Sequence, residues 1–305
     1  MQPPTTDLDG RVAIVTGAGD GLGRAEALAL AAAGARVVVN DLGDRAHEVV
    51  EELRSTGAEA EAVVGDVGEW SIGDRLVGTA IERFRRLDIV VNNAGIVRDG
   101  MLFNVDESQW DDVIRVHLKG HAAVSRAAAA HWRATSKASG APVDASVINT
   151  ASEAFLFGSA GQPNYAAAKA GITALTLATA HGLSRYGVRA NAICPRARTA
   201  MTAAVFGEGA SEGLDPLAPE RVATFVAYLA SPASAAISAQ VFVVYDDLVA
   251  LLAAPSVERT FTASDGTFSV DELADQLGDY FADRDPRRSF AAHEVASLDR
   301  TGANA

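Results

Sequence analysis

Two side chains suited to proton transfer, Tyr165 and Lys169, stand four positions apart. Four positions is just over one helical turn, so both side chains leave the same face of a helix. A phenol is a poor base at neutral pH because its reference pKa is about 10, and a nearby ammonium group favours the phenolate and lowers that pKa. We therefore expect Tyr165 to remove a proton from an alcohol, or to return one to a ketone.

The elements that position this pair follow from the pattern of apolar residues. Short runs rich in Val and Ile alternate with longer segments rich in Ala and Leu. The runs are apolar almost throughout rather than alternating, as in strands covered on both faces. The strands are expected at 12–15, 37–40, 62–66, 89–92, 147–150, 189–194 and 241–244, and the helices at 23–33, 45–56, 72–84, 110–134 and 165–186. This order predicts an α/β, Rossmann-like doubly wound fold with a seven-stranded parallel sheet and helices on both faces.

The sequence divides into one domain and a tail. Residues 8–246 are expected to form a single dinucleotide-binding and catalytic domain, followed by an acidic C-terminal extension at 247–305. From Asp246 to the end, 12 acidic and 5 basic residues give −7 of the total net charge of −13. Ser269 and Glu272 predict a capping box before a helix over 273–282. We expect the extension to be partly helical and either to close the site as a lid or to wrap a second subunit.

Composition excludes several classes of partner. A net charge of −13 argues against nucleic acid or an anionic membrane. No uncharged apolar run reaches about 18 residues, so no membrane-spanning helix is expected. The polar, Pro-rich start is not typical of a signal peptide. Cys194 is the only cysteine, which rules out an intrachain disulfide and favours a reducing compartment, and we expect a cytoplasmic location.

A glycine-rich loop stands between the first strand and the first helix. It reads Thr16-Gly17-Ala18-Gly19-Asp20-Gly21-Leu22-Gly23. Glycines let the backbone turn tightly and approach a pyrophosphate, while the helix N-terminus offers free N–H groups and a positive dipole end to that anion. Because the loop follows a strand and opens a helix, it predicts a dinucleotide site with contacts from Gly17 and from each residue of 19–23.

Further cofactor contacts are expected where the next strands end. Asp41 stands 18 positions after Gly23, close to the spacing of about 20 at which an acid binds ribose hydroxyls. A carboxylate there repels a 2′-phosphate, so NAD is favoured over NADP. The other candidates are Asp66 and Val67 at the adenine edge, and Asn93, Ala94 and Gly95 as a wall beside the adenosine ribose. The alternative for each is ordinary turn chemistry at a strand end.

Together these motifs resemble the short-chain dehydrogenase/reductase family over roughly residues 8–246. The likeness includes the glycine loop, the run Asn92-Asn93-Ala94-Gly95, the pair Tyr165/Lys169, and Ser152, which lies 13 positions before Tyr165 as is usual in the family. Within the family, segments 37–43, 90–99 and 116–120 are similar to the (3R)-hydroxyacyl-CoA dehydrogenase unit of peroxisomal multifunctional enzyme type 2. That group includes 17β-hydroxysteroid dehydrogenase type 4 and bacterial relatives acting on steroids and acyl-CoA side chains.

The resemblance implies roles for individual residues. Tyr165 would be the general acid/base, Lys169 would lower its pKa and bind the nicotinamide ribose, and Ser152 would hydrogen-bond the substrate oxygen. His117 stands where the family usually has the asparagine of a water relay, and is interpreted either as a catalytic residue or as a buried core histidine. Pro195 and Thr199 are expected at the nicotinamide end of the cofactor. Thr199 comes one position early, and Arg196 follows Pro195 where the family commonly has glycine.

The implied reaction is reversible hydride transfer between a secondary alcohol or ketone and NAD, with no metal ion. A 3-hydroxyacyl-CoA could place its phosphates on arginines, whereas a hydroxysteroid would use apolar residues. The arginines are Arg98, Arg115, Arg196 and Arg198, and the apolar residues are Phe155, Leu156, Phe157, Val205 and Phe206, the last two in a stretch at 199–219 that we interpret as a mobile lid.

Two other functions stay open. One is an NADPH-dependent 3-oxoacyl-(acyl carrier protein) ketoreductase, which Asp41 argues against. The other is a non-catalytic nucleotide-sensing protein, although such chains typically lack the serine or the tyrosine. The Ala-rich segments 120–130 and 166–180 have small faces of the kind that pair between subunits in the family. We therefore expect a homo-oligomer, a dimer or tetramer, acting on a small hydroxy or keto molecule.

Overall fold

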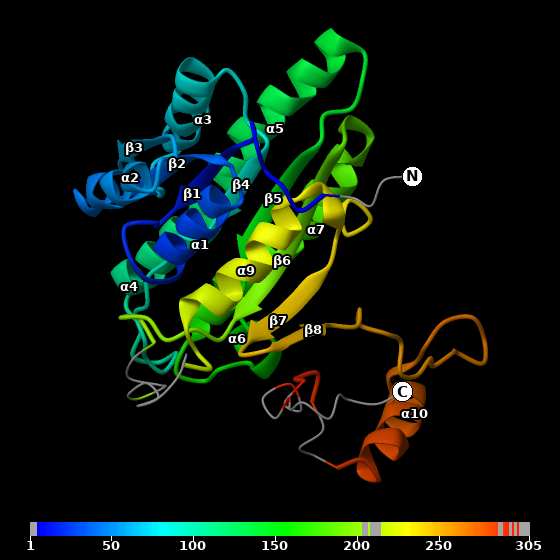
Figure 1. Ribbon diagram of the computed structural model, residues 1–305. Helices are drawn as coiled ribbons and strands as arrows, with labels where there is room; N and C mark the ends of the chain where they lie inside the picture. Colours follow the sequence, from blue (N-terminus) through cyan, green and yellow to red (C-terminus); the bar gives the residue numbers. More distant parts are fainter. Residues whose placement is uncertain are drawn as a thin grey trace.

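The computed structural model describes residues 5–202, 207, 215–285, 289–292, 295 and 298. Within these residues, eight strands form one sheet in the order β3-β2-β1-β4-β5-β6-β7-β8 (Figure 1). The strands are β1 (Val12–Thr16), β2 (Arg36–Asp41), β3 (Ala60–Val64), β4 (Ile89–Asn92), β5 (Ala145–Thr150), β6 (Val188–Pro195), β7 (Val241–Tyr245) and β8 (Leu248–Leu251). Strands β1 to β7 pair in parallel, which confirms the predicted doubly wound sheet.

All seven predicted parallel strands are present, and an eighth strand that was not predicted extends the sheet at its edge. Strand β8 pairs antiparallel with β7, with Val244 opposite Val249, after a turn in which Asp246 adopts a φ of 49°. Alternate residues of β8 are exposed, because helices do not cover both of its faces. A four-residue strand of this kind lacks the long apolar run that marks the buried parallel strands.

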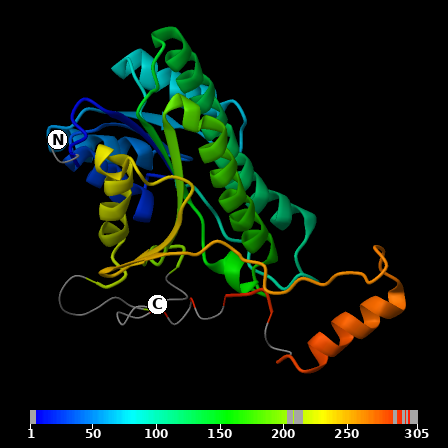
Figure 2. The ribbon, with the colours of Figure 1, turned by 90° about the vertical axis from the view of Figure 1, so that its right-hand side faces the viewer.

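Helices cover both faces of the sheet (Figures 1 and 2). One apolar cluster joins one face of the sheet to α1 (Gly21–Ala32), α2 (Arg45–Ser55) and α9 (Pro219–Ala230). A second cluster joins the opposite face to α3 (Ile72–Phe84) and α5 (Gly120–Ser139), and α7 (Pro163–Leu183) lies on the same side. Strand β1 is buried along its whole length, so the first strand lies in the middle of the core.

The single helix predicted over 110–134 is built from three pieces. Helix α4 (Glu107–Ile114) leads into a π-helical segment (Arg115–Lys119), and α5 follows. A π-helical turn inserts one residue into the helical register, so it rotates the side chains that follow it. Here that segment contains His117, whose buried ring faces the site described below. Gly120 comes next, and a Cβ there would lie 3.1 Å from Val67 Cγ2.

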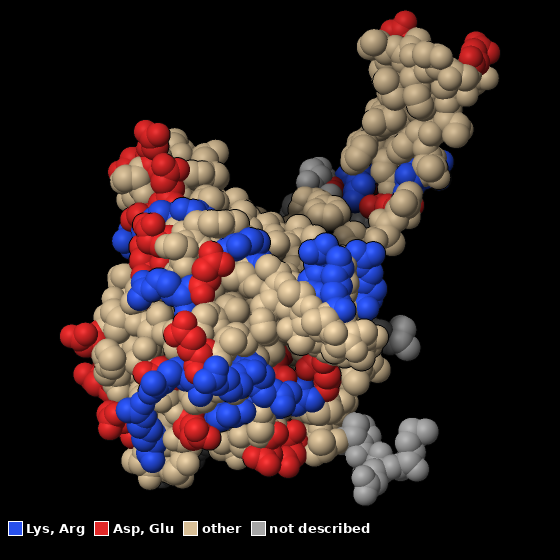
Figure 3. All heavy atoms as spheres, turned by 90° about the horizontal axis from the view of Figure 1, so that it is seen from above, with Lys and Arg blue, Asp and Glu red and all other residues tan. Residues whose placement is uncertain are grey.

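The C-terminal region contains the expected helix, α10 (Val270–Ala282). Ser269 caps it by accepting a hydrogen bond from Glu272 N at 3.1 Å. The Glu272 carboxylate accepts from Ser264 N instead of closing the capping box, so one half of the predicted motif is present. No residue of α10 is buried, and the helix, orange in Figure 2, projects from the body as an arm that is also visible in Figure 3.

Candidate active site

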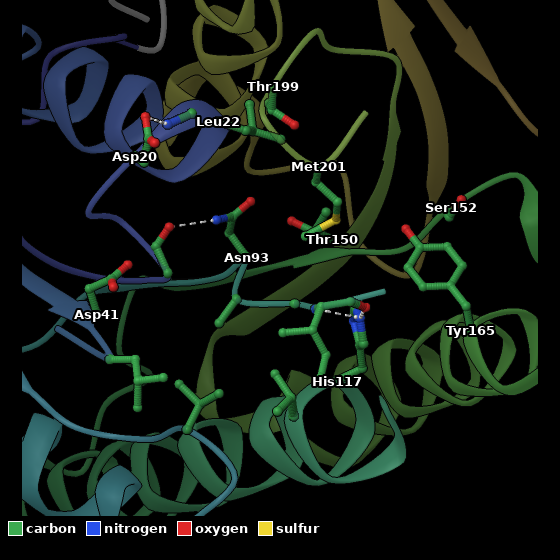
Figure 4. A pocket seen from close by; sticks show the side chains of 18 of the residues that line it. Asp20, Leu22, Asp41, Asn93, His117, Thr150, Ser152, Tyr165, Thr199 and Met201 are labelled. Atoms are coloured by element: carbon green, nitrogen blue, oxygen red, sulfur yellow. Dashed lines mark hydrogen bonds between the residues drawn. The ribbon is translucent and has the colours of Figure 1, made fainter. Parts of the chain in front are cut away.

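Most of the predicted site residues line one cleft at the carboxyl ends of the parallel strands. The cleft has a volume of about 450 Å³. It is lined by Gly17, Asp20, Gly21, Leu22, Asp41, Asp66, Val67, Asn93, Ala94, Gly95, His117, Ser152, Tyr165, Lys169, Pro195 and Thr199. Asp20 and Asp41 lie at one end and Ser152 and Tyr165 at the other (Figure 4). A ligand spanning the cleft would therefore connect the glycine loop to the proton-transfer pair.

The glycine loop has a backbone that requires glycine at several positions. Gly17 and Gly21 adopt φ values of +62° and +52°, in the left-handed region that favours glycine. A Cβ on Gly17 would lie 2.7 Å from Ala94 Cα, and a Cβ on Gly23 would overlap the Gly17 carbonyl oxygen. Gly23 does not line the cleft, so its glycine serves close packing beneath the loop. The bare backbone and the N-terminus of α1 fit a pyrophosphate, which supports a dinucleotide at this end.

Two polar side chains hold the loop in place. Asp41 Oδ2 accepts a hydrogen bond from Gly19 N at 3.0 Å, which ties the end of β2 to the loop. Asn93 Nδ2 donates to the carbonyl oxygens of Thr16 and Gly17 at 3.2 and 3.1 Å. Asn93, the residue that follows β4, is thus joined to the loop through its amide group. Gly19 donates its N–H to Asp41 and does not itself line the cleft.

Asp66 already has partners at the edge of the cleft. Its carboxylate pairs with Arg115 Nη1 and accepts from Gly68 N at 2.7 Å. Burial alone would raise the pKa of Asp66, but the hydrogen bonds from Arg115 and Gly68 outweigh it and lower the pKa. The Asp66 carboxylate is therefore charged at neutral pH, and the positive charge of Arg115 balances it.

The catalytic candidates converge from three elements. Pro163 stands at the start of α7, a position that its fixed φ favours, and the helix then carries Tyr165 and Lys169 on successive turns. Ser152 follows β5, and its hydroxyl lies beside that of Tyr165 at one end of the cleft. The two hydroxyls point toward one another in Figure 4. Lys169 Nζ donates to Thr150 O at 2.5 Å and lies 5.3 Å from the centroid of the Tyr165 ring.

The pKa of Tyr165 departs from the expectation drawn from spacing. Burial raises the pKa of Tyr165 to about 12, and the hydrogen bond from Ser152 only partly opposes this rise. Burial also lowers the pKa of Lys169 to about 7. A lysine that is only partly charged near neutral pH, and that donates to Thr150 O, cannot offset the desolvation of the phenolate. The lowered tyrosine pKa predicted from the four-residue spacing is therefore corrected: the protein alone raises it.

His117 packs directly against Tyr165. The two rings meet edge-on with centroids 5.2 Å apart. The imidazole Nε2 lies 2.7 Å from Ile96 O and 3.0 Å from Ile96 N, and a Cβ on Gly95 would overlap the ring. Burial and the nearby Lys169 lower the pKa of His117 to about 3, so the ring is neutral. These contacts make His117 a support for the backbone that follows Gly95.

Comparison with known proteins gives this arrangement a family. The family model for short chain dehydrogenases matches residues 11–208. The chain belongs to the short-chain dehydrogenase family. Its oxidoreductase class follows from that membership.

Several relatives are similar to this short-chain dehydrogenase over most of its length. The hydroxyacyl-CoA dehydrogenase ChsB1 of Mycobacterium tuberculosis is 53% identical, over 95% of each chain. The mouse peroxisomal multifunctional enzyme type 2 is 41% identical over 73% of this chain, which matches 30% of that larger protein. A crystal structure of a short chain dehydrogenase from Mycobacterium avium superposes with a TM-score of 0.83 at 44% identity, covering 92% of this chain and 97% of that one.

The arginines assigned to coenzyme A phosphates all have carboxylate partners. Arg196 pairs with Glu153 at 2.7 Å, Arg198 with Asp215 at 2.6 Å, and Arg98 with Asp112 at 3.6 Å. Arg115 pairs with Asp66, as described above. Arg115 also lies 3.6 Å from Asp112, three positions before it. The other partners are more distant along the chain, so local spacing does not reveal them.

The cleft is also lined by residues from the stretch interpreted as a lid. In the stretch interpreted as a lid, Val205 and Phe206 lie outside the described residues, whereas Met201 and Thr202 line the cleft. Neither residue was predicted to line the site, and nor was Thr150, whose carbonyl oxygen accepts a hydrogen bond from Lys169. The position of Thr150 at the end of β5 was the signal that could have indicated it. Among the helices that the structure describes, none is both long and apolar enough to cross a membrane.

Proposed function

We propose that this short-chain dehydrogenase oxidises the hydroxyl group of a 3-hydroxyacyl-CoA with NAD, and catalyses the reverse reduction. The observation that carries the proposal is the placement of the Tyr165 and Ser152 hydroxyls beside one another at one end of a cleft whose other end is the glycine loop. The substrate class is supported by the name of the relative that is 53% identical, a hydroxyacyl-CoA dehydrogenase.

The residues present fit a nicotinamide dinucleotide. Gly17 and Gly21 with the N-terminus of α1 would hold the pyrophosphate, Asp41 the adenosine ribose, and Lys169 the nicotinamide ribose. When bound, the dinucleotide supplies the hydride acceptor and, in its oxidised form, a positive charge. Thr199, which lies against Gly21, and Pro195 also line the cleft and are the residues expected at the nicotinamide.

In the oxidative direction Tyr165 removes the proton of the substrate hydroxyl, which Ser152 orients by a hydrogen bond. Because burial raises the pKa of Tyr165 to about 12, the phenolate needs positive charge nearby to stabilise it. The positive charge of the oxidised cofactor and a protonated Lys169 both favour the phenolate. Proton transfer at Tyr165 is therefore tied to occupation of the cofactor site.

The preference for NAD follows from Asp41 at the end of β2. A carboxylate beside a 2′-phosphate costs several kcal/mol, so we expect NAD to bind about 100-fold more tightly than NADP. Fluorescence titration of both dinucleotides tests this preference. Asp41→Asn should lower the ratio of the Kd of NADP to the Kd of NAD at least tenfold. Asp44→Asn, an exposed residue at the start of α2, is the matched control and should leave it unchanged. Tighter binding of NADP by the wild type would contradict the proposal and favour the ketoreductase alternative.

The substrate is tested by NADH absorbance with three alcohols. A 3-hydroxyacyl-CoA, the corresponding free 3-hydroxy acid and a 17-hydroxysteroid are compared by kcat/KM. We expect the CoA ester to be oxidised best. A steroid preferred by tenfold or more would move the assignment to the hydroxysteroid, and no NADH from any alcohol would support a nucleotide-sensing role.

Assembly as a homo-oligomer in the cytoplasm belongs to the same proposal. Helix α10 exposes 83% of Val270 and 55% of Phe281, and it projects from the body (Figure 3). An arm with exposed apolar residues gains burial against a second subunit. Light scattering coupled to gel filtration should give a dimer or tetramer, and a monomer would refute this part.

A further inference from the structure

Arg196 connects the loop of the catalytic serine to the C-terminal part of the chain. It follows Pro195 at the end of β6. Its Nε and Nη2 atoms donate to the two carboxylate oxygens of Glu153, both at 2.7 Å. The same Nη2 donates to Val295 O at 2.6 Å. Only 17% of the Arg196 side chain and 9% of the Glu153 side chain are exposed, so this is a nearly buried, two-pronged ion pair.

The chain segment that Arg196 meets is anchored at two further points. We call residues 289–292, 295 and 298 the strap. Ala292 N donates to Leu156 O at 3.0 Å, and Leu298 O accepts from the Tyr245 hydroxyl. The Tyr245 ring also lies 4.5 Å from the Arg196 guanidinium carbon, in cation–π contact. The strap, drawn in red, runs back beneath α6 (Ala154–Phe157) in Figure 2.

Glu153 is coupled to Ser152 through the backbone. It directly follows the serine, and its carbonyl oxygen accepts from Leu156 N at 2.8 Å and Phe157 N at 3.2 Å. Ser152 Oγ accepts from Ala154 N at 3.2 Å, in the same turn. A shift of Glu153 would therefore move both the backbone and the hydroxyl of Ser152.

We propose that Arg196 and Glu153 are a positioning pair for Ser152, with the strap as its outer anchor. The proposal rests on the proposed function, because it assumes that Ser152 orients the substrate oxygen. The planar guanidinium matches the carboxylate in a rigid fork. Loss of one partner leaves the other charge buried and unpaired, so Glu153 moves toward water and takes Ser152 with it.

This role accounts for an arginine where the family commonly has glycine. To bind a phosphate, Arg196 would need free N–H donors, yet it already donates three hydrogen bonds within the chain, two to Glu153 and one to Val295. The same contacts make the position of Ser152 depend on Val295, which lies 99 positions after Arg196.

The test compares Arg196→Gln with Arg86→Gln. Arg86 also forms a two-pronged pair with a nearly buried carboxylate, Asp88, at 2.8 and 2.6 Å, just before β4 at the other end of the sheet, although 51% of the Arg86 side chain is exposed. Hydrogen–deuterium exchange is measured on the peptide containing the amides of Ala154, Leu156 and Phe157. Arg196→Gln is expected to speed exchange there at least tenfold, and Arg86→Gln to leave it unchanged.

Kinetics give the second measurement. Misplacement of a reacting group by about 1 Å can cost up to 100-fold in rate. We expect Arg196→Gln to lower kcat roughly 10- to 100-fold while KM and the Kd of NAD change less than threefold. Arg196→Lys keeps the charge without the fork and should give an intermediate kcat, which also serves if Arg196→Gln fails to fold. Unchanged exchange and kcat in either variant would overturn the proposal.

The strap is tested by Tyr245→Phe, which removes the bond to Leu298 and keeps the ring beside Arg196. Its loss of kcat should be smaller than that of Arg196→Gln, and the two losses should not add in the double variant. Fully additive losses would overturn the strap as the anchor. A wild-type protein inactive on every alcohol would refute the proposed function, whereas the exchange data would still decide whether Arg196 holds the loop of Ser152.

Discussion

Glu26 gives the structure a strong dependence of stability on pH. It lies on α1 with no exposed surface, and neither carboxylate oxygen has a hydrogen-bond partner among the described residues. Burial raises the pKa of Glu26 from 4.5 to about 8. An isolated buried carboxylate is unfavourable, so the group holds a proton in the folded state at neutral pH.

The size of the effect follows from linkage. The folded state binds this proton more tightly than the unfolded chain does, so its stabilising contribution is complete below pH 4.5 and is lost as the pH rises to about 8. The difference between the two pKa values corresponds to about 5 kcal/mol in the free energy of unfolding. Between pH 5.5 and pH 8.5 the loss is about 3 kcal/mol.

Glu26→Gln keeps the shape of the side chain and removes its titration. Urea unfolding of variant and wild type at pH 5.5 and pH 8.5 isolates the contribution, because other titrating groups act equally on both proteins. We expect the variant's stability relative to wild type to rise by about 3 kcal/mol between the two pH values. Glu48→Gln, an exposed glutamate on α2, is the control. A relative stability that changes by less than about 1 kcal/mol would refute this account of Glu26.

Three further variants test the geometry. Gly23→Ala places a Cβ over a backbone oxygen of the glycine loop, so the affinity for NAD should fall at least tenfold by fluorescence titration; unchanged affinity would contradict the packing of the loop. Gly73→Ala meets the Ala123 backbone of α5 and should lower the melting temperature, whereas Gly78→Ala on the same helix meets nothing within 4 Å and should raise it slightly; the reverse order would be inconsistent with the α3–α5 contact. His117→Asn should keep kcat within tenfold and leave the rate profile between pH 6 and 9 unchanged, because the His117 pKa of about 3 keeps the ring neutral there; a 100-fold loss would assign the ring a direct chemical role.

Local patterns were sufficient to predict most of the fold and much of the site. The glycine loop and Asp41 stand at strand ends, and parallel strands bring such ends to one edge of the sheet. The helix that carries Tyr165 and Lys169 fixes their common face by its period. These inferences need only spacing along the chain, which is why the structure places both sets of residues around one cleft.

What the sequence could not predict depends on distant contacts. The pKa of Tyr165 is set by burial, which arises only when α7 packs against the sheet. The partners of Arg196 are 43 and 99 positions away, so no local pattern reveals that its donors are in use. The π-helical segment at His117 and the edge strand β8 are short, and each depends on the elements against which it packs.

The central claim is that Tyr165 transfers the proton in an NAD-linked oxidation, and Tyr165→Phe tests it most directly. The change removes one hydroxyl and keeps the ring against His117. We predict that kcat for oxidation of a 3-hydroxyacyl-CoA falls below detection, while the Kd of NAD stays within about threefold of wild type. A variant that retains a tenth or more of the wild-type kcat would contradict the claim.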